Sequence, residues 1–457
     1  MTTAAVPVPP AVPVPPPVPA LPVRHVAAVV VGNALQFYDF LTYAFFAVQI
    51  GRTFFPSHNA TSSLLASLAT FGVGFLSRPI GGLVIGVMGD RVGRKPAMML
   101  SFALMGVAII GLALTPSYRS IGVIAPIAVI AFRLLQGFAL GGEVGPSTAF
   151  LIEAAPPLKR GLYVSLQYMT QDAAVLVAGL VGVALANLLT PGDLDAWGWR
   201  VAFLIGAVIV PFGLLLRGGL PETLIAARAA EPQGERTALR PHVRIAILGL
   251  MLLGSGTIAS YLLTYMTTYA GTTLHMKASL AFGATVMLGL CGVICDPVGG
   301  WLSDRYGRKR VMLAPWVLLL FLVFPAFWML NHFRTSAALL AATALLTIPG
   351  SISGSSVLVG ITESLPPRIR SGALATLYAV AIATFGGTTQ FIVAWLISVT
   401  GNPLAPAWYM AGAVIVGVIA MVAMRETAPR LVGEGAGIGE HKPFISGEGS
   451  SDRVRAN

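Results

Sequence analysis

Long apolar segments recur along this chain and constrain its fold more than any other feature of the sequence. Each has about 20 residues or more, the length that a helix needs to cross the hydrocarbon core of a bilayer. Inside that core, a helix satisfies its own backbone hydrogen-bonding groups. The sequence therefore predicts an all-α membrane protein with twelve transmembrane helices. The predicted segments are 26–50, 62–88, 97–115, 121–150, 162–190, 199–218, 243–271, 278–302, 311–331, 335–358, 372–399 and 405–424.

The composition excludes several classes of protein. Only 10% of the 457 residues are charged and 56% are hydrophobic, whereas a soluble domain has about 25% charged residues. This excludes an ordinary soluble enzyme, a disordered protein and a nucleic-acid binder that relies on a basic patch. The formal net charge of +11 then indicates oriented membrane segments, with the lipid bilayer as a partner and no nucleic acid.

The basic residues between the segments indicate their orientation. If the N-terminus is cytoplasmic, the cytoplasmic loops hold sixteen Lys and Arg residues and the external loops hold five. Cytoplasmic loops are the ones normally enriched in these residues. We therefore expect an even number of helices in a bacterial inner membrane, with both termini cytoplasmic. The sixteen are Arg91, Arg94, Lys95, Lys159, Arg160, Arg217, Arg228, Arg236, Arg240, Arg244, Arg305, Arg308, Lys309, Arg310, Arg368 and Arg370, and the five are Arg52, Arg119, Arg200, Lys277 and Arg334.

Two tails and one long polar break divide the chain. Residues 1–23 are rich in Pro, lack the basic start of a secretory signal and predict a disordered tail. Residues 426–457 predict a second, flexible cytoplasmic tail. The longest interior break, 219–242, separates six segments from six. We therefore expect one six-helix bundle over 24–218, a cytoplasmic linker, and a second bundle over 243–425.

Two short motifs occur once in each half. Residues 86–95 (GVMGDRVGRK) match residues 300–309 (GWLSDRYGRK), and residues 153–160 (EAAPPLKR) match residues 363–370 (ESLPPRIR). The copies lie 214 and 210 residues apart, so the whole six-helix half is duplicated. Parallel repeats of this kind place the substrate between the halves, near the middle of the bilayer.

The first of these motifs predicts a gating latch in each half. Its glycines allow close helix packing, its Asp can accept hydrogen bonds from a helix N-terminus or an Arg, and its cations hold the loop at the cytoplasmic side. Topology alone would explain the cations but not the repeated Gly and Asp. The predicted gating residues are Gly86, Asp90, Arg91, Gly93 and Arg94 in the first half and Asp304, Arg305, Gly307 and Arg308 in the second.

This repeated loop resembles the signature loop of the major facilitator superfamily, and other motifs resemble its metabolite–proton symporter branch. Stretches 53–57 and 188–200 are most similar to the citrate–proton (tricarballylate) symporters. The resemblance covers about residues 24–425 and implies two pseudo-symmetric bundles that take up a small organic anion with protons by alternating access. The branch motifs are at 32–40, 71–81, 133–137, 197–200 and 385–387.

Within this resemblance, several substrates and one other function stay open. Members of the branch carry citrate, dicarboxylates, shikimate, or proline and betaine, and a sensor that binds without transport is a further alternative. Gln36 stands where the branch usually has Glu, so proton coupling through that position must differ here.

Six charged residues are predicted at membrane depth, where charge is costly and commonly functional. They are Asp39, Arg78, Arg133, Glu143, Asp172 and Asp296. Arg78 precedes Asp90 by 12 residues, which is about 18 Å along a helix and places it near the middle of the bilayer. Because guanidinium groups bind carboxylates bidentately, Arg78 and Arg133 suit a di- or tricarboxylate. Pairing of each Arg with an acidic neighbour is the alternative.

Helix four carries a polar stripe that includes Arg133, Gln136 and Glu143. The adjacent ridge of Gly137, Gly141 and Gly145 is typical of close helix packing. The resemblance implies that helix one lies across from helix four. We therefore predict a coupling pair between Asp39 and Arg133 that breaks on protonation, with Glu143 as the rival proton carrier.

The remaining candidates are mostly neutral. The predicted substrate-binding residues, besides the two arginines, are Asn33, Gln36, Gln167, Gln171, Tyr261, Tyr265 and Tyr378. The tyrosines can donate hydrogen bonds to a carboxylate, although ordinary packing explains such a stripe equally well. The role of Asp172 is open, and Asp296, before Pro297, is predicted at a helix break where it bonds freed backbone groups.

The sequence lacks the usual motifs of enzymes and pumps. It has neither a G-x-x-x-x-G-K-[ST] phosphate loop nor metal-ligand spacing, and no catalytic constellation stands out. We therefore expect a transporter without a cofactor, acting as a monomer.

Overall fold

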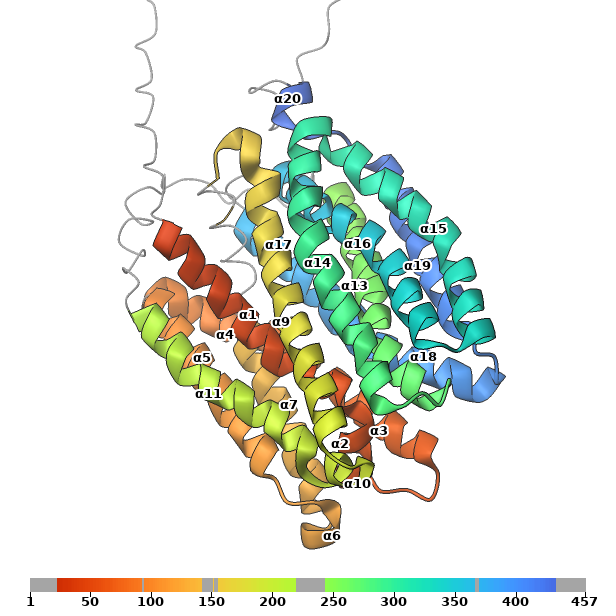
Figure 1. Cartoon of the computed structure of the whole chain (residues 1–457). Helices are drawn as coiled ribbons and strands as arrows, with labels where there is room; N and C mark the ends of the chain where they lie inside the picture. The colour runs from red at the N-terminus through yellow and green to blue at the C-terminus, as the bar shows by residue number, and fades with distance from the viewer. Residues whose placement is uncertain are drawn as a thin grey trace, which may run out of the picture.

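The computed structural model describes residues 23–92, 94–141, 151, 155–218, 243–365 and 370–432. Within these ranges, each of the twelve predicted segments coincides with one helix or with consecutive helices (Figure 1). Nine of the described helices are long and apolar enough to cross a membrane. The predicted N-terminal tail up to residue 22, the 219–242 linker and the chain beyond residue 432 lie outside the described residues.

The helices of the first half are α1 (Val23–Phe45), α2 (Ala47–Phe54), α3 (Ala60–Leu76), α4 (Arg78–Arg91), α5 (Arg94–Leu114), α6 (Tyr118–Ile121), α7 (Ile124–Gly141), η1 (Pro157–Lys159), α9 (Arg160–Leu188), α10 (Pro191–Asp193), η2 (Leu194–Gly198) and α11 (Trp199–Gly218). Those of the second half are α13 (Val243–Thr272), α14 (Ala278–Tyr306), α15 (Arg308–Phe333), α16 (Ser336–Ser364), α17 (Arg370–Ala381), η4 (Ile382–Gly386), α18 (Gly387–Thr400), α19 (Ala405–Ala423) and α20 (Pro429–Val432).

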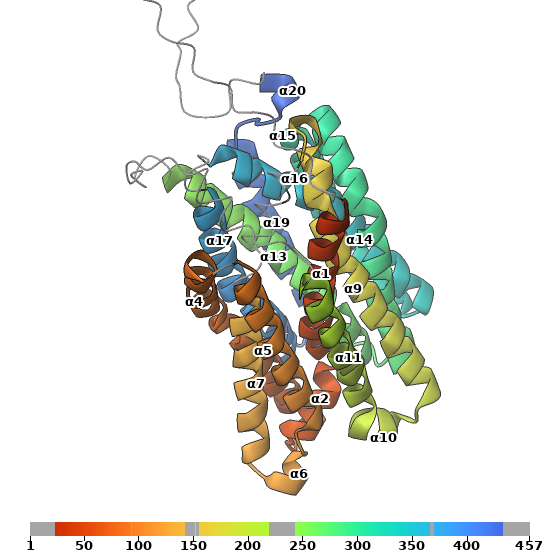
Figure 2. The same cartoon turned by 90° about the vertical axis from the view of Figure 1, so that its left-hand side faces the viewer.

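The long helices run side by side along the molecule, and α9 and α14 form the main seam between the halves (Figures 1 and 2). Glycine lets the two backbones approach closely: a Cβ on Gly289 would lie 2.3 Å from the Leu176 amide nitrogen, and one on Gly300 would lie 2.6 Å from the Gly161 carbonyl oxygen. A second seam joins α3 to α18, where a Cβ on Gly72 would lie 2.3 Å from the Gly387 carbonyl oxygen. Small residues at such contacts let the two helix backbones approach closely, because no bulky side chain stands between them.

The predicted packing ridge on the fourth helical span is confirmed where the structure describes it. A Cβ on Gly137 would lie 1.6 Å from the Gly74 carbonyl oxygen, and one on Gly141 would lie 2.0 Å from that of Arg78. These contacts hold α7 directly against α3 and α4, and thereby position both membrane arginines. Gly145 lies outside the described residues.

The predicted helix break at Asp296 is wrong. Helix α14 continues from Ala278 to Tyr306 with Pro297 inside it. A proline removes one backbone hydrogen bond, which a transmembrane helix packed among others tolerates. The Asp296 side chain therefore requires a different explanation.

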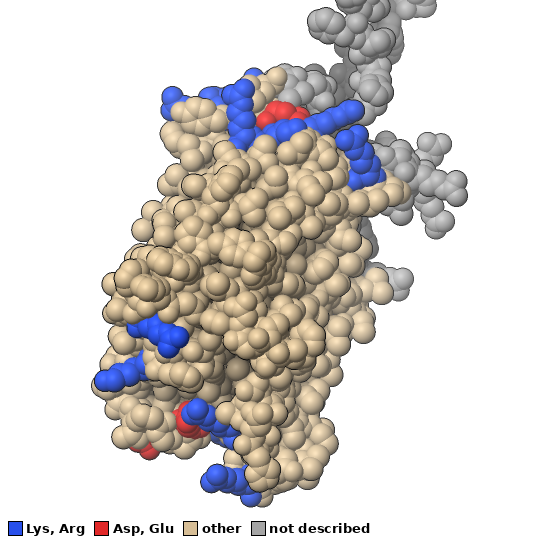
Figure 3. All heavy atoms as spheres, turned by 90° about the vertical axis from the view of Figure 1, so that its right-hand side faces the viewer, with Lys and Arg blue, Asp and Glu red and all other residues tan. Residues whose placement is uncertain are grey.

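On the surface, the charged residues gather at the ends of the molecule. Figure 3 shows Lys, Arg and acidic side chains at the end that carries α20, and a largely uncharged belt below it on this face. We call this end the α20 end and the opposite one, which carries α6 and α10, the α6 end. This distribution suits a bundle whose middle lies in hydrocarbon.

Candidate substrate cavity and latch

A cavity of about 180 Å³ lies between the two halves. The first half contributes side chains of α1 and α9, and the second half contributes α13, α14, α16 and α17 among other elements. Of the predicted substrate-binding residues, Gln171, Tyr261 and Tyr378 line it. Its position between the halves is the one expected for parallel six-helix repeats.

Two carboxyl groups meet in this cavity, one from each half. Asp172 of α9 and Asp296 of α14 both line it and lie within hydrogen-bonding reach of each other. Asp296 is 3% exposed and is adjacent to the Ser351 hydroxyl, and its Oδ2 atom has no hydrogen-bond partner among the residues that the structure describes. The sequence contained both residues, but no motif or spacing joins positions on helices five and eight. Only the packing of α9 on α14 brings them together.

Glycine makes this meeting possible. A Cβ on Gly292 would lie 1.7 Å from Oδ2 of Asp172, so the carboxyl group of Asp172 occupies the space above the α14 backbone. Gly292 and Asp296 are one helical turn apart and share a face of α14. The Asp172 carboxyl group therefore crosses the seam between the halves.

Arg133 lies beside the cavity rather than in its lining. Its guanidinium group is stacked near the rings of Phe40, Tyr43 and Phe71, at 4.3, 4.6 and 4.9 Å from their centroids. It donates hydrogen bonds to Oε1 of Gln136 at 2.7 Å and to the Phe71 carbonyl oxygen at 3.2 Å. Arg133 and Gln136 of the predicted polar stripe thus contact each other, and aromatic rings surround the guanidinium group.

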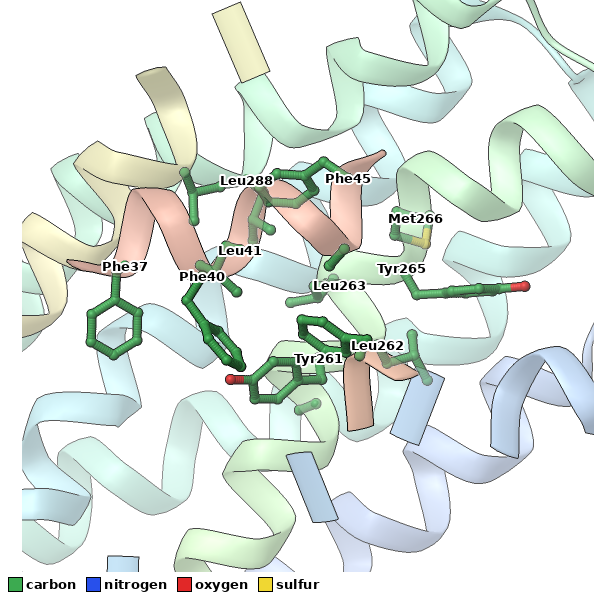
Figure 4. Close-up of a cluster of buried hydrophobic side chains, with 14 of the residues drawn as sticks. Phe37, Phe40, Leu41, Phe45, Tyr261, Leu262, Leu263, Tyr265, Met266 and Leu288 are labelled. Carbon is green, nitrogen blue, oxygen red and sulfur yellow. The ribbon is translucent and has the colours of Figure 1, made fainter. Parts of the chain in front are cut away.

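Arg78 lies in the same aromatic layer. Its guanidinium carbon is 4.3 Å from the ring centroids of both Phe40 and Phe75, and the group lies beside the hydroxyl of Tyr261. Tyr261 in turn lines the cavity and packs on Phe75 with their ring centroids 5.4 Å apart. Figure 4 shows Phe40 of α1 pointing toward Tyr261 of α13. Tyr261 therefore separates the arginine layer from the cavity.

The predicted Asp39–Arg133 pair is wrong for this conformation. Asp39 is 2% exposed and faces α11, where a Cβ on Gly206 would lie 1.8 Å from its Oδ1 atom. Phe40, the next residue, instead faces Arg133. Successive residues of a helix differ by about 100° in direction, so neighbours in the sequence face different helices. Glu143, the rival carrier, lies outside the described residues.

Other predicted site residues hold helices together or lie away from the cavity lining. Asn33 of α1 donates to the Gln167 carbonyl oxygen at 3.2 Å and to Thr170 Oγ1 at 3.3 Å. Gln36 is 1% exposed, and neither of its amide atoms has a partner among the described residues. Tyr265 is buried outside the lining, and Figure 4 shows its hydroxyl directed away from Tyr261. A step of four residues turns a helix about 40° past a full turn, so the tyrosine stripe diverges.

The loop between α14 and α15 joins the two halves at the α20 end. Asp304 accepts hydrogen bonds from the backbone amides of Gly161 at 2.8 Å and Leu162 at 2.9 Å, both in the first turn of α9. It also accepts one from Nη1 of Arg308 at 2.6 Å. A carboxylate at a helix N-terminus neutralises exposed amides and the positive end of the helix dipole. The predicted contacts of this Asp are therefore confirmed.

Arg308 connects the loop to α16. Its side chain is 1% exposed, and its Nε and Nη2 atoms lie 3.2 and 3.3 Å from the two carboxylate oxygens of Glu363. Arg160, which begins α9, lies 3.7 Å from the same carboxylate. We refer to Arg160, Asp304, Arg308 and Glu363 as the latch. In the matching loop of the first half, the structure does not describe Gly93, the packing of Gly86 or the side chains of Asp90, Arg91 and Arg94. In the second-half loop, Arg305 points outward over the ring of Trp301.

The C-terminal segment covers the latch. Gly307 has a φ of +100°, where only glycine is unstrained, and a Cβ there would lie 2.8 Å from Oε2 of Glu426. The Glu426 carboxylate caps α15 by accepting hydrogen bonds from the backbone amides of Arg308 at 2.8 Å and Lys309 at 3.0 Å. A side chain that follows the last long helix thus stabilises the start of α15.

Replacing Glu426 with Gln should lower the unfolding free energy by about 1 kcal/mol near neutral pH, the usual cost of a lost helix cap. Burial alone would raise the pKa of Glu426, but hydrogen bonds from four backbone amides outweigh it and lower the pKa below its ordinary value. The carboxylate therefore contributes stability above the ordinary glutamate pKa and loses it as the pH falls through the lowered value. Thermal unfolding in detergent should show the largest difference between variant and wild type near neutrality. A difference independent of pH would contradict this assignment.

The chain is similar to known membrane transporters in sequence. A family model described as "Sugar (and other) transporter" matches residues 25–240, and one described as "Major Facilitator Superfamily" matches residues 284–455. The chain is 35% identical to a citrate-proton symporter of Klebsiella pneumoniae, over 86% of this chain and 90% of that protein. It is 34% identical to the alpha-ketoglutarate permease of Escherichia coli (85% and 90%) and 32% identical to its proline/betaine transporter (89% and 84%).

Solved structures share the fold. The proton:xylose symporter XylE bound to 6-bromo-6-deoxy-D-glucose superposes with a TM-score of 0.72 at 17% identity, covering 89% of this chain and 96% of that one. A partially occluded, inward-open form of XylE from E. coli gives a TM-score of 0.69 at 16% identity, over 89% and 98%. These matches confirm the predicted architecture of two six-helix bundles.

Proposed function

Because this chain belongs to the major facilitator superfamily and is a proton-coupled metabolite symporter of the membrane, we propose that it imports a small organic anion by alternating access. Citrate or a related tricarboxylate is the proposed substrate. The relatives include two citrate-proton symporters, each of which matches 86% of this chain.

The observation that carries the anion assignment is a pair of buried membrane cations that have no carboxylate partner in the described part of the chain. Arg78 and Arg133 are 4% and 0% exposed. Among the described residues, no carboxylate lies within salt-bridge distance of either guanidinium group. A buried cation without an anionic partner is costly at this depth. A substrate carboxylate that displaces the Tyr261 ring would supply that partner and could bind bidentately.

Alternating access needs a gate on each side of the cavity. We assign the α20 end to the cytoplasm, because its loops carry the basic residues expected there. On this assignment the latch closes the cytoplasmic side, since Asp304 of the second half holds the first turn of α9 of the first half. Opening to the cytoplasm would then require these hydrogen bonds to break while the halves rock about the cavity.

A zwitterion such as proline or betaine is the second candidate substrate, and one observation favours it. The cavity lining combines two carboxyl groups with aromatic side chains, including Trp316, Tyr168 and Tyr378. Aromatic faces and carboxylates together attract quaternary ammonium groups. The arginine layer favours an anion, whereas the lining as it stands favours a cationic group.

Counterflow in proteoliposomes distinguishes these functions. Vesicles loaded with unlabelled citrate should accumulate labelled citrate, and excess proline or betaine should not compete. Competition by betaine with no citrate exchange would replace the anion proposal by the zwitterion proposal. Binding of citrate without exchange would indicate a sensor and contradict transport.

Replacing Arg78 with Ala should weaken citrate binding about 100-fold, because a charge-assisted bidentate contact is worth about 3 kcal/mol when desolvated. Isothermal titration of purified protein with citrate measures this directly. Arg119→Ala, at an exposed position in α6, is the matched control and should bind as the wild type does. Near-normal affinity in folded Arg78→Ala protein would remove Arg78 from the substrate site.

A further inference from the structure

The carboxyl groups of Asp172 and Asp296 are not used by the proposed anion site, and their geometry calls for an explanation. They come from opposite halves, and both line the cavity within hydrogen-bonding reach of each other. Asp296 is more than nine-tenths buried in the cavity wall, and no described residue hydrogen-bonds its Oδ2 atom. Two such groups at a moving interface are coupled directly to the conformational change.

The chemistry of this contact requires a proton. An ionised carboxylate only accepts hydrogen bonds, so two ionised groups at this separation repel each other. When one group is protonated, it can donate to the other, and the pair shares one proton as in other carboxyl dyads. Among the described residues that line the cavity there is neither Lys nor Arg to neutralise a second negative charge.

The described groups around the pair include no positively charged side chain. The titratable side chains that face it are Tyr168 on α9, Cys291 and Cys295 on α14, and Tyr378 on α17. From α16 it is faced by the neutral hydroxyl of Ser351. All of these groups are neutral when protonated, so the charge of this part of the cavity is set by the pair itself.

We propose that Asp172 and Asp296 together hold the transported proton, and that an anion enters the cavity only when the pair is protonated. This inference rests on the proposed function for its transport role. The protonated pair carries a charge of −1, and loss of the proton takes it to −2. The added charge repels an anionic substrate across the same cavity, which links proton release to substrate release.

The position of the pair explains how the proton is released. Asp172 moves with the first half and Asp296 with the second, so rocking of the halves lengthens their contact. Once separated, each carboxyl group is solvated by the open cavity, and the shared proton passes to water on that side. The empty transporter then returns without the proton, and the pair is protonated again once the cavity opens to the other side.

Infrared spectroscopy tests the shared proton without any substrate. Purified full-length protein near neutral pH should show the carbonyl stretch of a protonated carboxylic acid. Asp172→Asn and Asp296→Asn should each lose this band, because the remaining carboxylate gains an amide donor and stays ionised. Asp39→Asn should keep it. A band of unchanged intensity in both cavity variants would overturn the proposal, whatever its behaviour in Asp39→Asn.

Proteoliposomes test the coupling with labelled citrate. Each single variant has a fixed charge of −1 at the pair, as the protonated wild type does, so counterflow should persist and lose its dependence on pH. Accumulation driven by a pH gradient should fall to the level measured without a gradient. Asp195→Asn, which alters a carboxylate paired with Arg52 at the α6 end, is the matched control and should accumulate citrate normally.

The outcomes separate the two proposals. Normal gradient-driven accumulation in the cavity variants would overturn the proton role, and so would loss of counterflow in variants that remain folded by thermal unfolding. If wild-type vesicles do not exchange citrate at all, the proposed function fails, while the infrared result still decides whether the pair holds a proton.

Discussion

Replacing Arg308 with Ala should lower the unfolding free energy by about 3–5 kcal/mol, the cost of leaving buried charges without their partner. The guanidinium group contacts both Asp304 and Glu363 and has a side chain that is 1% exposed. Without it, two carboxylates would face each other at the latch with only the more distant Arg160 to offset them. Thermal unfolding of the purified protein in detergent measures this loss.

Two further variants show whether the latch geometry, rather than charge in general, causes the effect. Arg310→Ala removes an exposed cation two residues away and should leave stability near that of the wild type. Arg308→Lys restores the charge but not the planar fork of donors, so it should recover only part of the loss. Equal stability of Arg308→Ala and Arg310→Ala would show that the latch does not stabilise the fold.

Replacing Gly137 with Ala should prevent α7 from packing on α3. The added Cβ would lie 1.6 Å from the Gly74 carbonyl oxygen and 2.5 Å from Oγ of Ser77. The nearest of these atoms belongs to the backbone, so a helix must shift instead of a side chain. Overpacking of this kind costs about 1–3 kcal/mol and sometimes more. We expect the variant to sit at or above the upper end of this range and to lose citrate binding, because both arginines lie at this contact.

The matched control is Gly412→Ala in α19, where nothing lies within 4 Å of the added Cβ. Ala is a better helix former than Gly, so this substitution should leave thermal stability unchanged or slightly raise it. Size-exclusion profiles and thermal unfolding in detergent measure both variants. A stable, monodisperse Gly137→Ala protein would show that α3 and α7 can separate without cost.

Asp39 and Asp296 are recognisable in the sequence as candidate site residues, but the residues that they contact are not. Both were identified as membrane carboxylates, because charge at this depth is rare and conspicuous in the sequence. Their partners were not identifiable: Asp39 faces Gly206 instead of Arg133, and Asp296 faces Asp172 instead of freed backbone groups. A rotation of about 100° per residue decides which neighbour a side chain meets, and the angular position of a helix depends on all of its packing contacts.

The second-half loop shows the opposite case. The sequence predicted that Asp304 would bind a helix N-terminus or an Arg, and it binds both. The contact with Arg308 was predictable because the two residues are four positions apart in the same motif. For the long-range contact only the type of partner, a helix N-terminus, was predictable, and the tertiary structure decided that it is the start of α9. The contribution of Glu426 from beyond α19 was not predictable, because no spacing relates it to residue 308.

The sequence by itself determined the membrane architecture of this protein: the apolar segments, their number, the duplicated half and the ends at which charge gathers. These follow from the cost of exposing backbone and charge to hydrocarbon, which acts on each segment separately and is readable from composition. The tertiary structure alone decided that Tyr261 separates the arginines from the cavity and that Asp172 meets Asp296 across the seam. Asp172 and Asp296 are more than 120 positions apart in the sequence. Both sets of contacts depend on the rotation and close approach of packed helices.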